Sequence, residues 1–187
     1  MRKMAIAAMA FFFAAITGCA QPPTDQRELA RVQWLSGIKE IIKSDDLADY
    51  HNVATQLNLQ LSARHPFQVK DVDGNVTGNS FDVETVPVAD KREKNDIEFY
   101  YGIYTPNDQS YQRAMLSVRN VTLGECVTES DIYSAFGYVR GKTYPHSTTY
   151  SIDYHFEGRN SIDLYLTFNS INDKCAREIT VFQNRWK

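Results

Sequence analysis

The sequence lacks most of the features that would assign a function at once. Only three of its 187 residues are cysteine, too few for a small domain held together mainly by disulfides. It has no excess of basic residues, because its formal net charge is −3 at pH 7, and this disfavours a dedicated nucleic-acid binder. With 43% hydrophobic and 23% charged residues, its composition is that of an ordinary globular protein rather than a disordered or fibrous one.

Motifs that indicate catalysis or metal binding are also missing. The chain has no Gly-x-Ser-x-Gly elbow, no His-Glu-x-x-His pair and no phosphate-binding glycine loop. In the segment Asp71–Asn75 the glycine comes too early for a calcium loop, and a turn is the simpler interpretation. We therefore expect a binding protein rather than an enzyme, with no cofactor and no metal. The histidines are scattered singly, which is typical of surface residues rather than ligands: His51, His65, His146 and His155.

The one long apolar run lies at the amino terminus. Arg2 and Lys3 precede fifteen uncharged residues, Met4 to Gly18, which is the size of a signal-peptide core and short for a membrane span. The run ends in Ile16-Thr17-Gly18-Cys19, which resembles the lipobox where bacterial signal peptidase II cuts before a cysteine that becomes acylated. We expect residues 1–18 to be a signal peptide and Cys19 to carry the lipid. The alternative is a plain secreted protein in which Cys19 is incidental.

The residue after Cys19 indicates where such a lipoprotein would reside. It is Ala20 rather than the Asp that commonly retains lipoproteins at the inner membrane, so we predict the outer membrane, with the body facing the periplasm. Each buried CH₂ of an acyl chain contributes about 0.8 kcal/mol, so several chains would hold the protein firmly. Loss of two positive charges with residues 1–18 would change the net charge from −3 to −5.

The other two cysteines, Cys126 and Cys175, predict one disulfide. They form an even pair in an oxidising compartment. The bridge would close a loop of about 50 residues and stabilise the fold by about 4 kcal/mol on the chain-entropy model. Free buried thiols or a catalytic cysteine remain alternatives, although neither cysteine has a histidine beside it in sequence.

Apolar spacing predicts an α+β fold in which an N-terminal α-hairpin precedes an antiparallel sheet. After a lipidated tether over residues 19–25, helical spacing runs from Leu29 to Ile42, and Ser44–Asp46 should end this helix and cap a second one over Leu47–Leu57. The period then shifts towards two. Strands are expected over residues 81–85, 97–103 and 112–121, with a charged connecting loop over residues 90–96.

The C-terminal half has its own helix and three strands. Thr128 with Asp131 forms a capping-box pattern that should begin a short helix, which Gly137 ends. Alternating strands follow over residues 150–156, 162–168 and 178–183. We therefore divide the body into an N-terminal part, 26–122, and a C-terminal part, 123–187. The two parts are interpreted as either unrelated or degenerate helix-then-meander modules in tandem, since residues 96–102 (DIEFYYG) partly match 151–158 (SIDYHFEG).

The C-terminal part resembles a known small module. Gly124, Thr128, Asp131-Ile132 and Gly137, followed by three strands, are similar to the module shared by the outer-membrane assembly lipoprotein BamE and the β-lactamase-inhibitor proteins. The cysteine pair and the N-terminal α-hairpin depart from BamE, and a tandem arrangement would be closer to the inhibitors. The resemblance implies a module that binds another protein and is not an enzyme.

Strand parity also predicts a binding face. If Phe99, Tyr101 and Ile103 face the helices, the residues between them face away, and such an outer face is usually polar. Here it would be rich in tyrosine, which is enriched in binding hot spots. The alternative is that residues 68–90 cover this face and make it part of the core. The predicted partner-binding residues are Tyr100, Tyr104, Asp153, His155, Tyr165 and Phe182.

Three functions compete on this basis. The first is an inhibitor, such as a type VI secretion immunity lipoprotein that occludes the active site of a secreted hydrolase, for example a phospholipase. The second is a structural lipoprotein of outer-membrane assembly or envelope maintenance. The third is an enzyme whose site the sequence does not display. Expected partners are another protein and, through the lipid, the membrane, but no nucleic acid.

Overall fold

Two helices open the part of the chain that the structure describes. The computed structural model describes residues 24–86, 98–119, 126–143 and 148–184, and both Cys19 and the predicted loop over residues 90–96 lie outside these ranges. Helix α1 spans Thr24–Ser44 and α2 spans Tyr50–Leu57. The last two residues of the predicted tether therefore belong to α1. On its described side chains, α1 buries an apolar stripe against the sheet: Leu35, Ile38, Ile41 and Ile42.

The second helix begins later than predicted, because its cap is not in the segment Ser44–Asp46. The carboxylate of Asp49 accepts hydrogen bonds from the backbone N–H groups of His51 and Asn52, each at 3.1 Å. The carboxylate of Asp46 instead accepts the N–H of Ala48. Leu47 is thus a fully buried residue of the connection rather than the first residue of α2.

The rest of the described chain forms one large antiparallel sheet with a short helix inserted in its sequence. The sheet runs in the order β1-β3-β4-β5-β9-β8-β7-β6, and β2 also pairs with β3. The strands not foreseen are β1, β2 and β6, which are short. The elements are β1 (Leu61–Ala63), β2 (Phe67–Lys70), β3 (Val76–Thr85), β4 (Glu98–Pro106), β5 (Arg113–Arg119), α3 (Glu129–Phe136), β6 (Lys142–Thr143), β7 (Tyr150–Phe156), β8 (Ser161–Phe168) and β9 (Glu178–Asn184).

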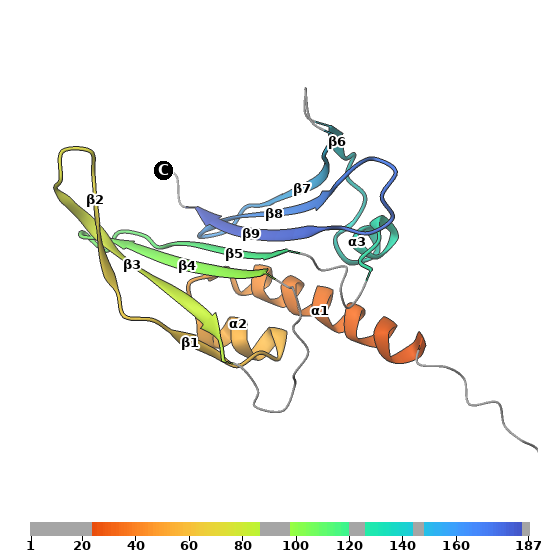
Figure 1. Ribbon diagram of the computed structural model, residues 1–187, viewed down its shortest axis with the longest axis horizontal. Helices are drawn as coiled ribbons and strands as arrows, with labels where there is room; N and C mark the ends of the chain where they lie inside the picture. Colours follow the sequence, from red (N-terminus) through yellow and green to blue (C-terminus); the bar gives the residue numbers. More distant parts are fainter. Residues whose placement is uncertain (1–23, 87–97, 120–125, 144–147, 185–187) are drawn as a thin grey trace, which may run out of the picture.

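Two meanders meet at the middle of this sheet. Strands β3, β4 and β5 form one meander, strands β7, β8 and β9 form the other, and they pair through their last strands, β5 and β9. The buried apolar residues of both halves belong to a single core, so the parts 26–122 and 123–187 share one sheet and one interior. Figure 1 shows this continuity from the green strands to the blue ones.

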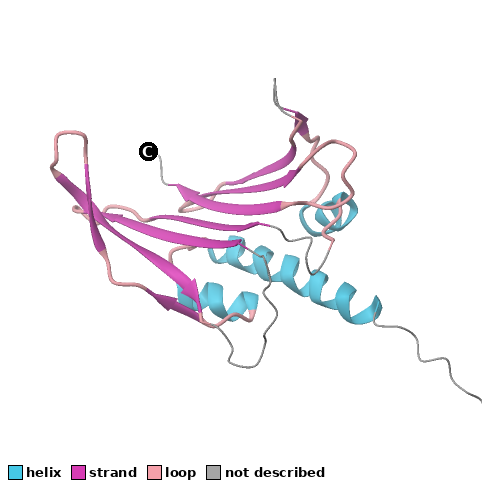
Figure 2. Cartoon of the chain, in the orientation of Figure 1, coloured by secondary structure: helices cyan, strands magenta, loops and turns pink. Residues whose placement is uncertain are grey.

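The helices lie on one face of the sheet (Figures 1 and 2). This covered face presents apolar residues from every central strand, among them Tyr101, Leu116, Leu164 and Val181, each at most 1% exposed. The hydroxyl of Tyr101 donates to the carbonyl of Leu47 and so connects the sheet to the turn between α1 and α2. The predicted α+β class, with N-terminal helices before an antiparallel sheet, is confirmed.

The features predicted around α3 are confirmed. Thr128 and Asp131 form a reciprocal capping box at the start of the helix, and Gly137 caps its end. Cys126 and Cys175 are bonded as a disulfide, with their Cα atoms 4.9 Å apart. The bridge joins the residues before α3 to the turn before β9, where the N–H of Ala176 donates to the carbonyl of Val127 at 2.8 Å.

Candidate functional site

The face of the sheet opposite the helices, called the open face below, is the strongest candidate for function. We define it by the outward-pointing residues of β4, β5, β9, β8 and β7. No described helix or strand lies over it (Figure 1). Because directly paired residues in antiparallel strands point to the same side, the register arranges these side chains in rows that cross the sheet.

The first row contains three of the predicted residues. Tyr100 pairs with Ser117, Ser117 with Thr180, Thr180 with Tyr165, and Tyr165 with Asp153. Tyr100 is 52% exposed and Tyr165 is 36% exposed, so the aromatic groups stand on either side of two hydroxyl residues.

Asp153, the last residue of the first row, differs from the two tyrosines. Its carboxylate accepts a hydrogen bond from the hydroxyl of Ser151 at 2.7 Å and forms an ion pair with Lys142 at 3.4 Å. Its side chain is only 13% exposed. The carboxylate of Asp153 is therefore engaged by its neighbours at the edge of the open face, and little of it is exposed to a partner.

The other predicted residues lie in the next two rows. Phe182 pairs with Met115 on one side and with Asp163 on the other, and Asp163 pairs with His155. The Nδ1 atom of His155 lies 2.6 Å from a carboxylate oxygen of Asp163. Tyr104, one row further on, is half-buried and donates its hydroxyl to the carbonyl of Thr77 at 3.0 Å. All six predicted residues therefore share one face, and their role in binding a partner stays a prediction.

The alternative that residues 68–90 cover this face does not hold for the described part of that segment. Residues 67–70 and 76–85 are strands β2 and β3, which extend the sheet sideways instead of folding over it. Residues 87–90 lie outside the described ranges.

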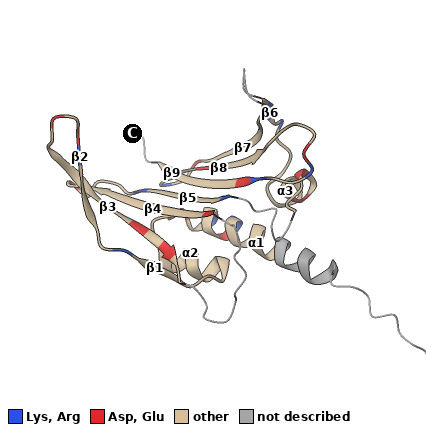
Figure 3. Cartoon of the chain, viewed as in Figure 1, with Lys and Arg blue, Asp and Glu red and all other residues tan. Residues whose placement is uncertain are grey.

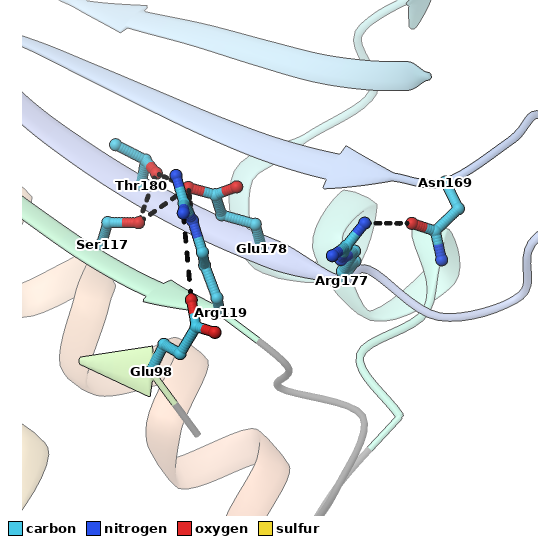
Figure 4. A network of polar contacts seen from close by, with 7 residues as sticks. All are labelled: Glu98, Ser117, Arg119, Asn169, Arg177, Glu178 and Thr180. Carbon is cyan, nitrogen blue, oxygen red and sulfur yellow. Dashed lines mark hydrogen bonds and ion pairs between the residues drawn. The ribbon is translucent and has the colours of Figure 1, made fainter. Parts of the chain in front are cut away.

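A polar network that the sequence did not predict borders the first row (Figure 4). The carboxylate of Glu178 accepts hydrogen bonds from Ser117 at 2.8 Å and Thr180 at 3.2 Å, and pairs with the guanidinium of Arg119 at 3.1 Å. Arg119 also lies 3.8 Å from Glu98. Although burial raises the pKa of Glu178, these hydrogen bonds and the positive charge outweigh it and lower the pKa overall.

Beside this network the surface forms a hollow of about 400 Å³. It has two carboxylates and two guanidinium groups, so its charges balance. Arg177 donates to the side-chain oxygen of Asn169 at 3.0 Å on its far side (Figure 4). The lining of the hollow consists of Glu98, Arg119, Thr149, Thr167, Phe168, Asn169, Arg177 and Glu178.

Sequence reasoning placed residues on the open face but missed the charged network of Glu98, Arg119 and Glu178. Alternation alone puts Glu98, Ser117 and Arg119 on the outer side of β4 and β5. Their meeting with Glu178 depends on the pairing of β5 with β9, which joins residues about sixty positions apart. No local pattern specifies such a pairing, so the network was not predictable from one sequence.

The described residues contain no group of three or more His, Cys, Asp or Glu side chains that could hold a metal ion. No helix among them is long and apolar enough to cross a membrane. Comparison with protein-family models, curated proteins and solved structures found no significant match to this chain. The resemblance to the BamE and inhibitor module therefore rests on the quoted residues alone.

Proposed function

We propose that this protein is an outer-membrane lipoprotein, anchored through Cys19, whose periplasmic body binds and inhibits another protein. The observation that carries the proposal is the open face, where exposed Tyr100 and Tyr165 flank a hydrogen-bonded polar row. We infer that the inhibited protein is a secreted hydrolase, such as a phospholipase effector, and that this chain is the immunity protein that neutralises it.

The composition of the open face supports protein binding. Tyrosine offers a large contact area with few rotatable bonds, so little entropy is lost when it is fixed in an interface. The ring of Tyr100 lies against the sheet before a partner binds. The hydroxyl of Tyr100 lies over Gly102, where an added Cβ would come within 2.7 Å of it, so the glycine leaves room for the ring to lie along the sheet. Such preorganisation reduces the free-energy cost of association.

Occlusion is the inhibitory mechanism that fits this surface. A broad face of aromatic and polar side chains can cover the mouth of an enzyme without chemistry of its own. The mature chain would carry a net charge of −5, since two positive charges are lost from −3, and this would favour encounter with a basic hydrolase. Inhibition would then be stoichiometric and reversible, and a tightly bound complex should survive purification.

The deciding experiment uses residues 20–187 as bait in periplasmic and secreted-protein extracts. We expect capture of one secreted hydrolase, whose activity is abolished at one equivalent of bait. The double substitution Tyr100→Ala and Tyr165→Ala should weaken this inhibition by roughly a thousandfold, since hot-spot tyrosines contribute about 2 kcal/mol each. Capture of barrel-assembly components instead, with no effect on any hydrolase, would make this a structural envelope lipoprotein.

A matched control separates the open face from a general effect of exposed tyrosine. Tyr138 is 77% exposed and follows α3, outside the open face, where its ring lies 5.0 Å from that of Tyr133. Tyr138→Ala should leave inhibition unchanged. A loss as large as that of the open-face variant would contradict the proposed location of the binding surface.

A further inference from the structure

The hairpin formed by β2 and the first half of β3, residues 67–80, extends beyond the body as an arm. In Figure 1 it rises at the end of the molecule opposite the start of α1, and its tip lies on the side of the sheet away from α1 and α2. The arm is fastened at its base. Asn79 pairs with Thr105, Gly78 pairs with Pro106, and Ser80 donates its hydroxyl to the carbonyl of Ile103 at 3.0 Å.

Along β3, the apolar side chains shift from the covered face of the sheet in the body to its open side in the arm. In the body, Phe81 and Val83 of β3 point to the covered face and pack into the core. In the arm, Phe67 pairs with Ser80 and Val69 pairs with Gly78, so both apolar side chains point to the same side as Tyr104, which is the open side. The polar pair Gln68 and Asn79 points the other way.

This change exposes apolar surface where a sheet usually shows polar residues. Phe67 is 52% exposed and lies on an ordered strand rather than in a flexible loop. Contiguous exposed apolar groups, rather than isolated ones, mark contact surfaces, and Phe67 and Val69 lie on the same side of the sheet as Tyr104. The apolar side continues into a hollow of about 420 Å³ at the base of the arm, which is lined by Thr77, Tyr104, Pro106, Asn107, Asp108 and Tyr111.

Three acidic residues lie on the rim of this surface. Asp71 and Asp73 lie at the tip of the arm, where Figure 3 shows acidic residues, and Asp108 borders the hollow. Hydrogen bonds from Asn75 lower the pKa of Asp71, and hydrogen bonds from Ser110 lower that of Asp108, so both are ionised at neutral pH. The positive charges nearby are those of exposed Lys70, which pairs with Val76 just before the tip, and of Arg113, which lies 5.2 Å above the ring of Tyr111.

We propose that the open side of the arm and the adjoining hollow bind a basic segment of the partner protein that carries an apolar side chain at its centre. The apolar side chain would contact Phe67 and Val69, and its flanking lysine or arginine residues would face Asp71, Asp73 and Asp108. This inference rests on the proposed function and identifies which part of the partner is held. The arm would act as a second contact region beside the tyrosine row.

The test pans a random twelve-residue peptide library against the mature, anchor-free chain. We expect enrichment of peptides with a central aromatic or aliphatic residue flanked by lysine or arginine. Phe67→Ala should weaken their binding roughly thirtyfold. Gln68→Ala, the matched truncation on the other side of the same strand, should change it by less than about twofold. Thermal unfolding of both variants checks that the fold is retained.

The charge requirement is tested separately with Asp73→Lys. Asp71 rather than Asp73 holds the turn, because its carboxylate accepts the N–H groups of Asp73 and Asn75 at 3.0 and 2.8 Å. Reversal of the charge at Asp73 should therefore weaken the binding of the basic peptides about fivefold or more without opening the hairpin. Enrichment of acidic or uncharged peptides, or no enrichment at all, would overturn the proposal.

Other outcomes distinguish this inference from the proposed function. Peptides that bind Phe67→Ala as tightly as the unmodified chain would overturn the role of the arm. Self-association that Phe67→Ala abolishes would also overturn it, and would make a second copy of the chain the occupant. If Tyr100→Ala with Tyr165→Ala abolishes hydrolase inhibition while Phe67→Ala does not, the proposed function stands and the arm proposal fails. If peptides bind the arm but no hydrolase is inhibited, the arm proposal stands and the proposed inhibitory function fails.

Discussion

Tyr100 and Tyr101 are adjacent and chemically identical, but they belong to opposite faces of the sheet. Tyr101 is 1% exposed, donates its hydroxyl to the carbonyl of Leu47, and has a pKa raised by burial and by the negative charges of Asp46 and Asp49. Tyr100 is 52% exposed and lies over Gly102. This difference indicates that the covered face contributes most of the stability of the fold, while the open face is largely available for contacts with another molecule.

The largest effect should come from truncating the buried member of this pair. Tyr101→Ala should lower the free energy of unfolding by about 4 kcal/mol, because it leaves a cavity and a buried carbonyl without its donor. Tyr100→Ala should lower it by less than about 1 kcal/mol. Urea denaturation of the two variants measures both values. Equal losses would show that the open face also belongs to the core and would break the comparison.

An intermediate effect is expected for the network on the open face. Glu178→Gln removes the ion pair with Arg119 and should cost about 1.5 kcal/mol at pH 7. The pKa of Glu178 is lower in the folded than in the unfolded chain, so its stabilisation is fully present above the ordinary value of 4.5 and is lost as pH falls through the folded value. Urea titrations from pH 7 down to pH 3 should therefore show the free energies of unfolding of the unmodified chain and of Glu178→Gln becoming equal. A difference that stays constant with pH would exclude this ionisation as its source.

The smallest effect should come from the ion pair at the edge of the open face. Lys142 is 64% exposed, and its amino group lies 3.4 Å from the carboxylate of Asp153. Lys142→Met should change the free energy of unfolding by less than about 0.5 kcal/mol, because exposed pairs gain little in water. A loss above about 1.5 kcal/mol in the same denaturation assay would mean that the open face contributes to folding more than its exposure suggests.

Much of this architecture followed from local patterns. Alternation at Phe99, Tyr101 and Ile103 correctly assigned the covered face, and the Thr128–Asp131 capping box and the two later cysteines specified their structures without tertiary information. These predictions succeeded because period, cap and covalent bond are properties of short segments or of residue type.

The rest depended on contacts between distant segments. The cap of α2 was misplaced because several acidic residues follow α1, and backbone geometry decides which one accepts its N–H groups. The arm was not predicted because Phe67 and Val69 alternate like residues of a core strand. Only their pairing with Ser80 and Gly78 places them on the open side. The charged network needed the β5–β9 pairing for the same reason.

The position of β9 has a consequence for the order of events when the protein is made. It is the last described strand in sequence but lies between β5 and β8, at the centre of the sheet. Until residues 178–184 are available, β5 and β8 have no strand between them, and each keeps an unpaired edge. A chain made from its amino terminus onward therefore cannot close its sheet before this strand is complete. Completion of the sheet waits for this last described strand, so C-terminal truncation should be far more damaging than loss of an edge strand.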